Sequence, residues 1–220
     1  MTTSTADLFA VIDAGDETAV AAQLASDAGL ASARDPAGVS ATRHALYRHR
    51  RRIAARLAAT VPELDVFEAA ALGRADRVRE VLNSDPAAAR AASRDGFTPL
   101  HLAAFFASAA GAETATALLD AGADVNARSS NEMGVLPLHS AVSAGNDGVV
   151  AVLIEAGADV NAVQRERYTA LHGAAHNGAE ATVDRLLAAG ADRTATTDDG
   201  RTAADMAEAA GHPELAARLR

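Results

Sequence analysis

The chain has 220 residues, no cysteine, and 29 acidic against 20 basic residues, which gives a net charge of −9. This negative charge argues against general affinity for nucleic acids, and the absence of cysteine excludes disulfides and thiolate chemistry and fits a reducing compartment. Every basic residue is arginine, so lysine Schiff-base and phosphate-loop chemistry are excluded.

The N-terminal sequence is not typical of a secretory signal, because it lacks a basic start and a sufficient apolar run. No uncharged apolar stretch approaches the roughly 18 residues that a membrane-spanning helix needs. We therefore expect a cytoplasmic protein without a membrane segment.

The first helical unit is predicted over residues 6–34. Leu8 and Ile12 fall on one helical face, Gly15 breaks the pattern, and a second amphipathic stretch follows. This unit lacks the threonine–proline start of later units, as expected of a terminal cap whose outer face meets water.

Two further units are predicted over 35–64 and 65–94. In the first of these, Ser40 is placed as a helix N-cap, and His49 stands where the other units carry glycine between their helices. In the next unit, Pro86 should end the second helix, since the residue before proline disfavours helical geometry.

The unit at 95–127 has the clearest pattern. Thr98 is a predicted N-cap and Pro99 occupies the first helical position, where its missing N–H costs nothing. Gly122 should end the second helix in the left-handed conformation. About three additional residues between the two helices should lengthen the first helix or the turn.

The sequence of this unit recurs along the chain. Its TPLH at Thr98–His101 returns as LPLH at Leu136–His139, as TALH at Thr169–His172 and in weaker form as TAAD at Thr202–Asp205. GAD likewise recurs at Gly122, Gly157 and Gly190. This pattern, with a period near 33 residues, resembles the ankyrin repeat, and the arginine and alanine bias is similar to that of a bacterial protein from a GC-rich source.

The remaining units are predicted over 128–162, 163–195 and 196–220. Leu136 replaces the capping threonine, which should weaken that helix start by about 1 kcal/mol. Arg167 stands where glycine is usual in the turn between units.

The resemblance implies one domain over 1–220, an all-α solenoid of about seven helix-turn-helix repeats joined by short finger turns. It also implies a structural role for His101, His139 and His172, which would hydrogen-bond the backbone of the neighbouring finger. We expect no metal site, no cofactor and no enzyme activity, because the sequence has no catalytic or phosphate-binding motif.

In proteins of this family, fingers and first helices form a concave groove that binds other proteins. The positions that the repeat leaves variable carry most of the aromatic residues here, and aromatic residues are enriched at binding hot spots. Filling of local space by Phe105 and Phe106 is the alternative interpretation. The expected partner-binding residues are Tyr47, Arg48, Phe97, Phe105, Phe106, Met133, Arg165, Glu166, Tyr168, His176 and Asn177.

A second candidate surface is the basic segment 43–57, which holds six arginines and no acid. Arg48, Arg50, Arg51 and Arg52 could bind phosphate or carboxylate groups, or they could form a solvated face that complements the acidic remainder of the chain. The sequence thus predicts a monomeric, non-catalytic scaffold that binds another protein, such as one with an acidic segment and an apolar anchor; the alternative is anion or nucleic-acid binding through Arg48–Arg52.

Overall fold

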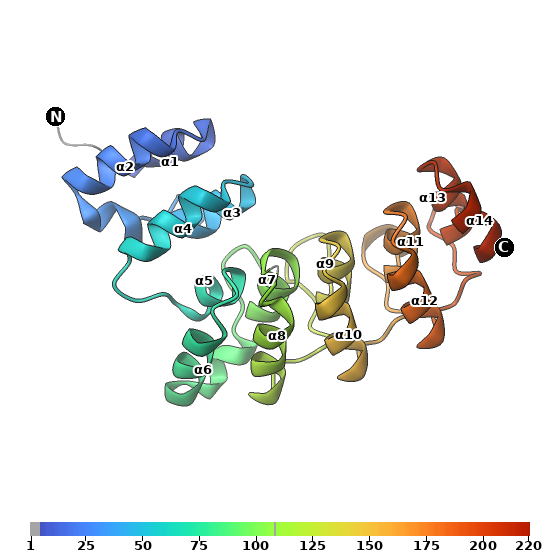
Figure 1. Cartoon of the computed structure of the whole chain (residues 1–220). Coiled ribbons are helices and arrows are strands. Elements are labelled where there is room, and N and C mark those ends of the chain that lie inside the picture. The colour runs from blue at the N-terminus through green and yellow to red at the C-terminus, as the bar shows by residue number, and fades with distance from the viewer. Residues whose placement is uncertain (1–4, 108) are drawn as a thin grey trace.

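The computed structural model describes residues 5–107 and 109–220, and these fold into successive pairs of antiparallel helices (Figure 1). The first helices of the pairs are α1 (Thr5–Ala14), α3 (Ala41–Tyr47), α5 (Val66–Ala71), α7 (Pro99–Phe106), α9 (Pro137–Ser143), α11 (Ala170–His176) and α13 (Ala203–Ala209). The second helices are α2 (Glu17–Ser26), α4 (Arg51–Thr60), α6 (Ala75–Ser84), α8 (Gly111–Asp120), α10 (Asp147–Glu155), α12 (Glu180–Ala188) and α14 (Pro213–Leu219). The expected all-α repeat solenoid is confirmed.

Short irregular elements connect these pairs. Three 3₁₀ turns, η1 (Ala28–Ser32), η2 (Pro86–Arg90) and η3 (Arg165–Arg167), lie in the connections. Isolated antiparallel bridges close two of the fingers, Arg34 with Ser40 and Val163 with Thr169. None of the described helices combines the length and the apolar character that crossing a membrane requires.

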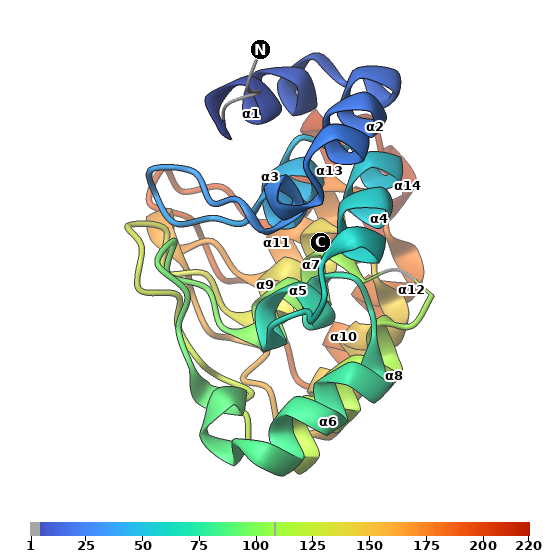
Figure 2. The same ribbon diagram turned by 90° about the vertical axis from the view of Figure 1, so that its left-hand side faces the viewer.

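From α5 onward the pairs form two parallel layers (Figure 1). The first helices pack on one another in one layer and the second helices in the other, while the fingers project together on one side (Figure 2). We call the face formed by the first helices and the fingers the inner surface. Its shape follows from the repeat, since each unit packs mainly on its neighbours.

Most first helices begin at a side-chain cap. Thr98, Thr169 and Thr202 each accept a hydrogen bond from a backbone N–H in the first helical turn, and Ser40 does the same at α3. Leu136 makes no such bond at α9, so this helix lacks a side-chain cap, and the expected weakening of its start stays a prediction.

The three repeat histidines join neighbouring units, as the resemblance implied. The Nε2 of His101 hydrogen-bonds the Val135 carbonyl of the next finger at 2.9 Å. His139 bonds the Tyr168 carbonyl and His172 the Arg201 carbonyl, both at 3.2 Å. In this geometry Nε2–H donates, and Nδ1 is left as the acceptor.

The core is divided into two apolar clusters. One extends through α5–α14, which we call the repeat stack. The other fills α1–α4, which we call the N-terminal unit, and it includes Leu102 and Phe106 from α7. In Figure 1 the N-terminal unit is tilted away from the row formed by the repeat stack.

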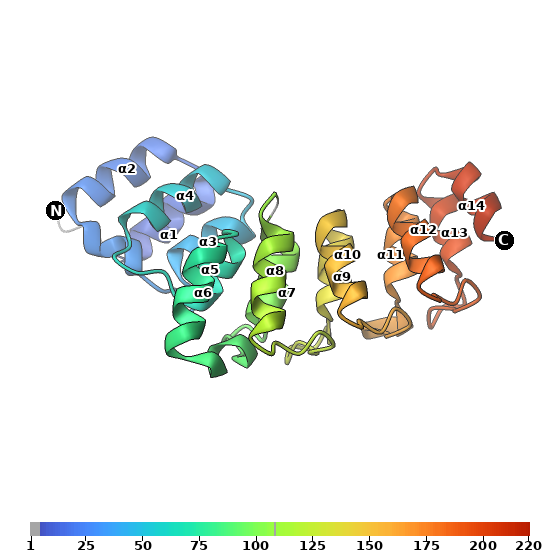
Figure 3. The ribbon, with the colours of Figure 1, turned by 60° about the horizontal axis from the view of Figure 1, so that its bottom comes forward.

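The layer of second helices is interrupted where these two parts meet. Helix α6 packs on α8 and α8 on α10, whereas α4 packs on α2 and α3 (Figure 3). A hollow of about 660 Å³ lies between the end of α4 and α6, lined by residues that include Val61, Leu64, Arg74 and Arg77. The N-terminal unit therefore contacts the repeat stack mainly through its first-helix side.

Two turns adopt left-handed backbone without glycine. His49 has φ of 57° in the position where five other pairs carry a glycine of positive φ, namely Gly15, Gly73, Gly145, Gly178 and Gly211. In the finger before α11, Glu166 and Arg167 have φ of 63° and 55°. The sequence departure at Arg167 thus leaves the turn in place at a conformational cost, because residues with a Cβ rarely adopt this region.

Candidate functional site

A pocket of about 470 Å³ lies on the inner surface over α7, α9 and α11. Its walls are mainly aromatic and aliphatic, and they include five of the seven aromatic residues of the chain. It is lined by Tyr47, Phe97, His101, Leu102, Phe105, Phe106, Met133, Val135, His139, Ser140, Val142, Ser143, Gln164, Tyr168, Thr169, Ala170, Gly173, His176 and Asn177.

Small residues make room for this pocket at one repeated position. The residue that follows His101 in α7 is Leu102, and the equivalent residue of α13 is Met206. Between them, α9 carries Ser140 and α11 carries Gly173. The pocket lies where two successive helices lack the large side chain that their neighbours carry.

Gly173 is not required by the backbone, since its φ does not lie in the left-handed region. It costs about 1 kcal/mol relative to alanine at a helix interior. A Cβ there would lie 3.3 Å from Val142 Cγ1 and 3.4 Å from Tyr168 Cε1. The absence of this side chain lets the Tyr168 ring lie against α11 as a wall of the pocket.

The described lining residues include no aspartate, glutamate, lysine or arginine. Burial lowers the pKa of His101, and it lowers the pKa of His139 to about 4, so both imidazoles are neutral near pH 7. Burial also raises the pKa of Tyr168, and burial together with the Asp95 carboxylate raises that of Tyr47. The parts of the walls formed by His101, His139, Tyr47 and Tyr168 are therefore uncharged at neutral pH.

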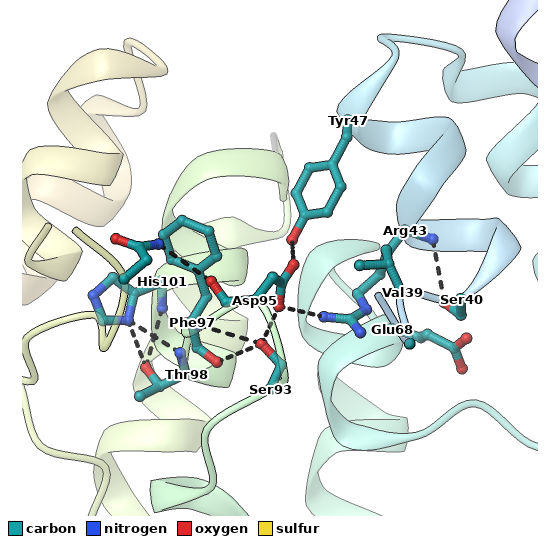
Figure 4. A network of polar contacts seen from close by, with 12 residues as sticks. Val39, Ser40, Arg43, Tyr47, Glu68, Ser93, Asp95, Phe97, Thr98 and His101 are labelled. Carbon is teal, nitrogen blue, oxygen red and sulfur yellow. Dashed lines mark hydrogen bonds and ion pairs between the residues drawn. The ribbon is translucent and has the colours of Figure 1, made fainter. Parts of the chain in front are cut away.

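At one end of the pocket, Asp95 joins the N-terminal unit to the repeat stack (Figure 4). Its carboxylate accepts hydrogen bonds from the hydroxyls of Tyr47 and Ser93, and Arg43 Nη1 lies 3.3 Å from Oδ1. The Arg43 side chain is only 3% exposed and also lies 5.5 Å from the centre of the Phe67 ring. Burial works to raise the pKa of Asp95, but the bonds from Ser93 and Tyr47 and the charge of Arg43 outweigh it and lower that pKa.

The structure brings most of the expected partner-binding residues together. Eight of the eleven line this one pocket: Tyr47, Phe97, Phe105, Phe106, Met133, Tyr168, His176 and Asn177. Arg165 and Glu166 lie on the exposed tip of the next finger. Arg48 lies outside the pocket, with its Nε 2.8 Å from Asp13 Oδ1.

Phe105 and Phe106 have different environments. Phe106 is 7% exposed and belongs to the core of the N-terminal unit, where its ring lies 5.3 Å from that of Tyr47. Phe105 is half-buried and packs its edge on Phe106 at 4.8 Å. Phe106 thus packs in the core with one side on the pocket, which agrees with the space-filling interpretation of this ring, and its role in partner binding stays a prediction.

Three of the four arginines of the basic segment contact other parts of the fold. Arg48 pairs with Asp13, Arg50 donates to the Asp13 carbonyl at 3.2 Å, and Arg51 donates to the Phe106 carbonyl at 3.1 Å. Arg52 is exposed at the start of α4. The local excess of positive charge in the sequence is therefore partly offset by groups that come from other units.

Sequence reasoning missed several residues that shape this site. The sequence did not indicate a role for Arg43 or Asp95, because their contact forms only when the N-terminal unit packs on the repeat stack. Ser140 and Gly173 could have been found by comparing the residue after each repeat histidine. Val163 is 38% exposed on the finger next to that of Met133, although an apolar residue of this kind is expected to be buried.

Comparisons with known proteins agree with this architecture. A family profile described as "Ankyrin repeats (3 copies)" matches residues 66–164 and 138–220, which together cover more than half of the chain. Human and mouse Neurogenic locus notch homolog protein 2 are each 49% identical to this chain over 61 residues, or 28% of it. The aligned segment is 2% of the length of those relatives, so the likeness is to a small part of each. With its capped helix pairs, its histidine links between fingers and this match, the chain belongs to the ankyrin-repeat family.

Proposed function

We propose that this protein is a non-catalytic scaffold that binds another protein through the inner surface of its ankyrin repeats. The observation that carries this proposal is the position of the exposed apolar side chains. Met133 is 45% exposed and Val163 38%, and they are the large hydrophobic residues that the described part of the chain exposes. They lie on adjacent fingers, which the Arg165 N–H joins by donating to the Met133 carbonyl at 3.1 Å.

Exposed apolar residues on a rigid surface favour association, because little conformational entropy is lost when they are buried. Arg165 and Glu166 lie on the same finger as Val163, His176 and Asn177 line the pocket together with Met133, and all four are exposed. We therefore propose a partner segment with an apolar anchor over Met133 and Val163, flanked by polar or acidic groups that pair with Arg165. The lack of cysteine favours a cytoplasmic setting, and we propose that the protein binds this partner as a monomer.

The test is affinity capture from a lysate of the source cell with wild-type protein and the double variant Met133→Glu/Val163→Glu. We expect a partner that the wild type retains and the variant loses by at least about tenfold, because an anchor cannot be buried against two carboxylates. Thr116→Glu is the matched control, since Thr116 is exposed on α8 in the other layer. Equal retention by all three proteins would contradict the proposal.

An arm at high salt examines the basic segment. A different result is a partner that the wild type and Met133→Glu/Val163→Glu capture equally, but that is lost at high salt and lost when Arg52 is changed to Glu. This result would instead favour anion or nucleic-acid binding at Arg48–Arg52. No described observation favours that alternative at present, because most of these arginines already have partners within the fold.

A further inference from the structure

We propose that the pocket over α7, α9 and α11 binds a small, uncharged aromatic molecule. This goes beyond the protein partner proposed above, and it depends on the interior of the pocket, which shares Met133 but not Val163 with the finger surface. Its volume of about 470 Å³ lies within the roughly 300–1,000 Å³ range of small-molecule sites. Such sites are often found where two structural units meet, and here the N-terminal unit and the repeat stack share the walls.

The space arises from specific residues. If Ser140 and Gly173 were as large as Leu102 and Met206, side chains would fill it, as they do at the equivalent positions of α7 and α13. Gly173 destabilises its helix relative to alanine, and no backbone constraint requires it. A residue that is unfavourable for folding and that enlarges a pocket is consistent with selection for the space.

The lining selects for an uncharged ligand. The described lining residues carry no acidic or basic side chain apart from histidine, and both His101 and His139 are held neutral by burial. A charged ligand would lose its hydration there without gaining a counter-charge. The rings of Phe97, Phe105 and Tyr168 favour a planar aromatic group, since they can stack on it or meet its edge.

A few polar groups among the lining residues could orient such a molecule. The hydroxyls of Ser140 and Ser143, the Gln164 amide and the His176 imidazole belong to the pocket. By contrast, the Nε2 atoms of His101 and His139 already bond backbone carbonyls. The ligand class that fits is therefore a neutral aromatic molecule with one or two hydrogen-bonding groups.

The occupied pocket should also restrain the N-terminal unit. Tyr47 lines the pocket from α3, while the other rings come from the repeat stack. A bound molecule would contact both parts at once and stabilise their association by mass action.

Two fluorescent probes that differ by one charged group provide the test. N-phenyl-1-naphthylamine is neutral, and 8-anilino-1-naphthalenesulfonate is its sulfonated analogue. We expect the neutral probe to bind the full chain with one site and at least about tenfold more tightly than the anion, because the site offers no counter-charge. It should also slow hydrogen exchange in α3. No binding of the neutral probe, or equal binding of the two probes, would overturn the proposal.

Two variants locate the site. Ser140→Leu places in α9 the side chain that α7 carries at Leu102, and it should weaken binding of the neutral probe at least tenfold. Gly173→Ala adds a methyl group 3.3 Å from Val142 Cγ1 and 3.4 Å from Tyr168 Cε1, and it should weaken binding several-fold because both side chains are walls of the pocket. Thr116→Leu on exposed α8 is the control and should bind as the wild type does.

A Gly173→Ala protein that unfolds as cooperatively as the wild type and still binds the probe more weakly separates loss of the site from loss of the fold. If Ser140→Leu does not fold, Gly173→Ala decides the question alone. Unchanged affinity in Gly173→Ala would overturn the proposal. The capture experiment with Met133→Glu/Val163→Glu measures binding of a protein partner, whereas Gly173→Ala measures binding of the neutral probe. The two proposals can therefore fail separately.

Discussion

At the scale of single residues, the capping threonine decides whether Nδ1 of the repeat histidine has a hydrogen-bond partner. Nδ1 of His101 accepts hydrogen bonds from the Thr98 hydroxyl at 2.8 Å and from the Thr98 N–H at 3.2 Å. Nδ1 of His172 has the same partners in Thr169. In α9, Leu136 replaces the threonine, and Nδ1 of His139 is buried without a hydrogen-bond partner. His139 is therefore the repeat histidine with the fewest compensating contacts.

This residue should make the fold sensitive to mild acid. Its pKa in the folded state is about 4, against 6.5 for the model side chain, so the unfolded chain binds a proton first as the pH falls. Stability is fully present above pH 6.5 and decreases towards pH 4. At about 1.4 kcal/mol per unit, the fall of roughly 2.5 units corresponds to about 3 kcal/mol.

Urea unfolding of the wild type and of His139→Gln at the two ends of this pH window tests the expectation. Glutamine keeps an N–H that can donate to the Tyr168 carbonyl but does not titrate in this range. The variant should lose about 3 kcal/mol less stability than the wild type over the window. Parallel losses in the two proteins would show that His139 is not the sensitive group.

At the scale of elements, α7 belongs to both parts of the molecule. It is eight residues long where α9, α11 and α13 have seven, which agrees with the longer first helix or turn expected from the insertion. Its Leu100, Ala103 and Ala104 face the repeat stack, while Leu102 and Phe106 enter the core of the N-terminal unit. Residue 108, which belongs to the inserted turn, lies outside the described residues.

The two neighbouring rings of α7 should therefore differ in their effect on stability. Phe106→Ala should cost about 3–5 kcal/mol, because it leaves a cavity between the two parts. Phe105→Ala should cost less than about 1.5 kcal/mol, since its ring is half-exposed. Leu138→Ala, with its side chain 2% exposed in the middle of the stack, is the reference and should cost about 2–5 kcal/mol. Chemical unfolding of the three variants measures how much unfolding free energy each substitution removes. A loss in Phe105→Ala equal to that in Leu138→Ala would place Phe105 in the core.

At the scale of the whole molecule, the position of the N-terminal unit depends on few contacts. The second-helix layer does not continue from α4 to α6, so the junction is formed by the packing of α3 on α5, the apolar contacts around Phe106 and the polar contacts of Asp95, together with the Arg34–Asp65 pair and the Arg51 bond to the Phe106 carbonyl. Asp95 is also part of its own finger, through the Ser93 hydroxyl. One carboxylate therefore stabilises a turn and holds two bodies together.

Removing this charge should release the N-terminal unit. Asp95→Asn leaves the Arg43 guanidinium buried without a counter-charge, which should cost about 3–5 kcal/mol. Hydrogen exchange should accelerate in α3 and α4 and stay unchanged in α10 and α12, because the junction opens before the stack.

Asp199→Asn is the matched control. Asp199 occupies the equivalent place in the last finger, where it accepts from Thr197 Oγ1 at 2.5 Å and pairs with Arg201 of the same finger. This pair is exposed to solvent, so its loss should change stability much less than the loss of the buried Asp95–Arg43 pair. If Asp95→Asn is no more harmful than Asp199→Asn, the junction does not depend on the Asp95 carboxylate.

The sequence by itself determined the repeating part of this protein. Caps such as Thr98 and left-handed glycines such as Gly122 are set by contacts within one unit, so the local sequence was enough to predict them. The histidine links between units followed from the resemblance to the ankyrin repeat. It also indicated which aromatic residues gather on the inner surface, because a repeat fixes the face of every position.

Only the tertiary structure decided what depends on the angle between units. The sequence showed no reason why α4 should separate from α6, why Asp95 should meet Arg43 and Tyr47, or why Phe106 should be buried while Phe105 is not. These contacts join residues 48 to 59 positions apart across a junction that breaks the repeat. A pattern based on regular stacking cannot predict a contact that exists because the stacking changes.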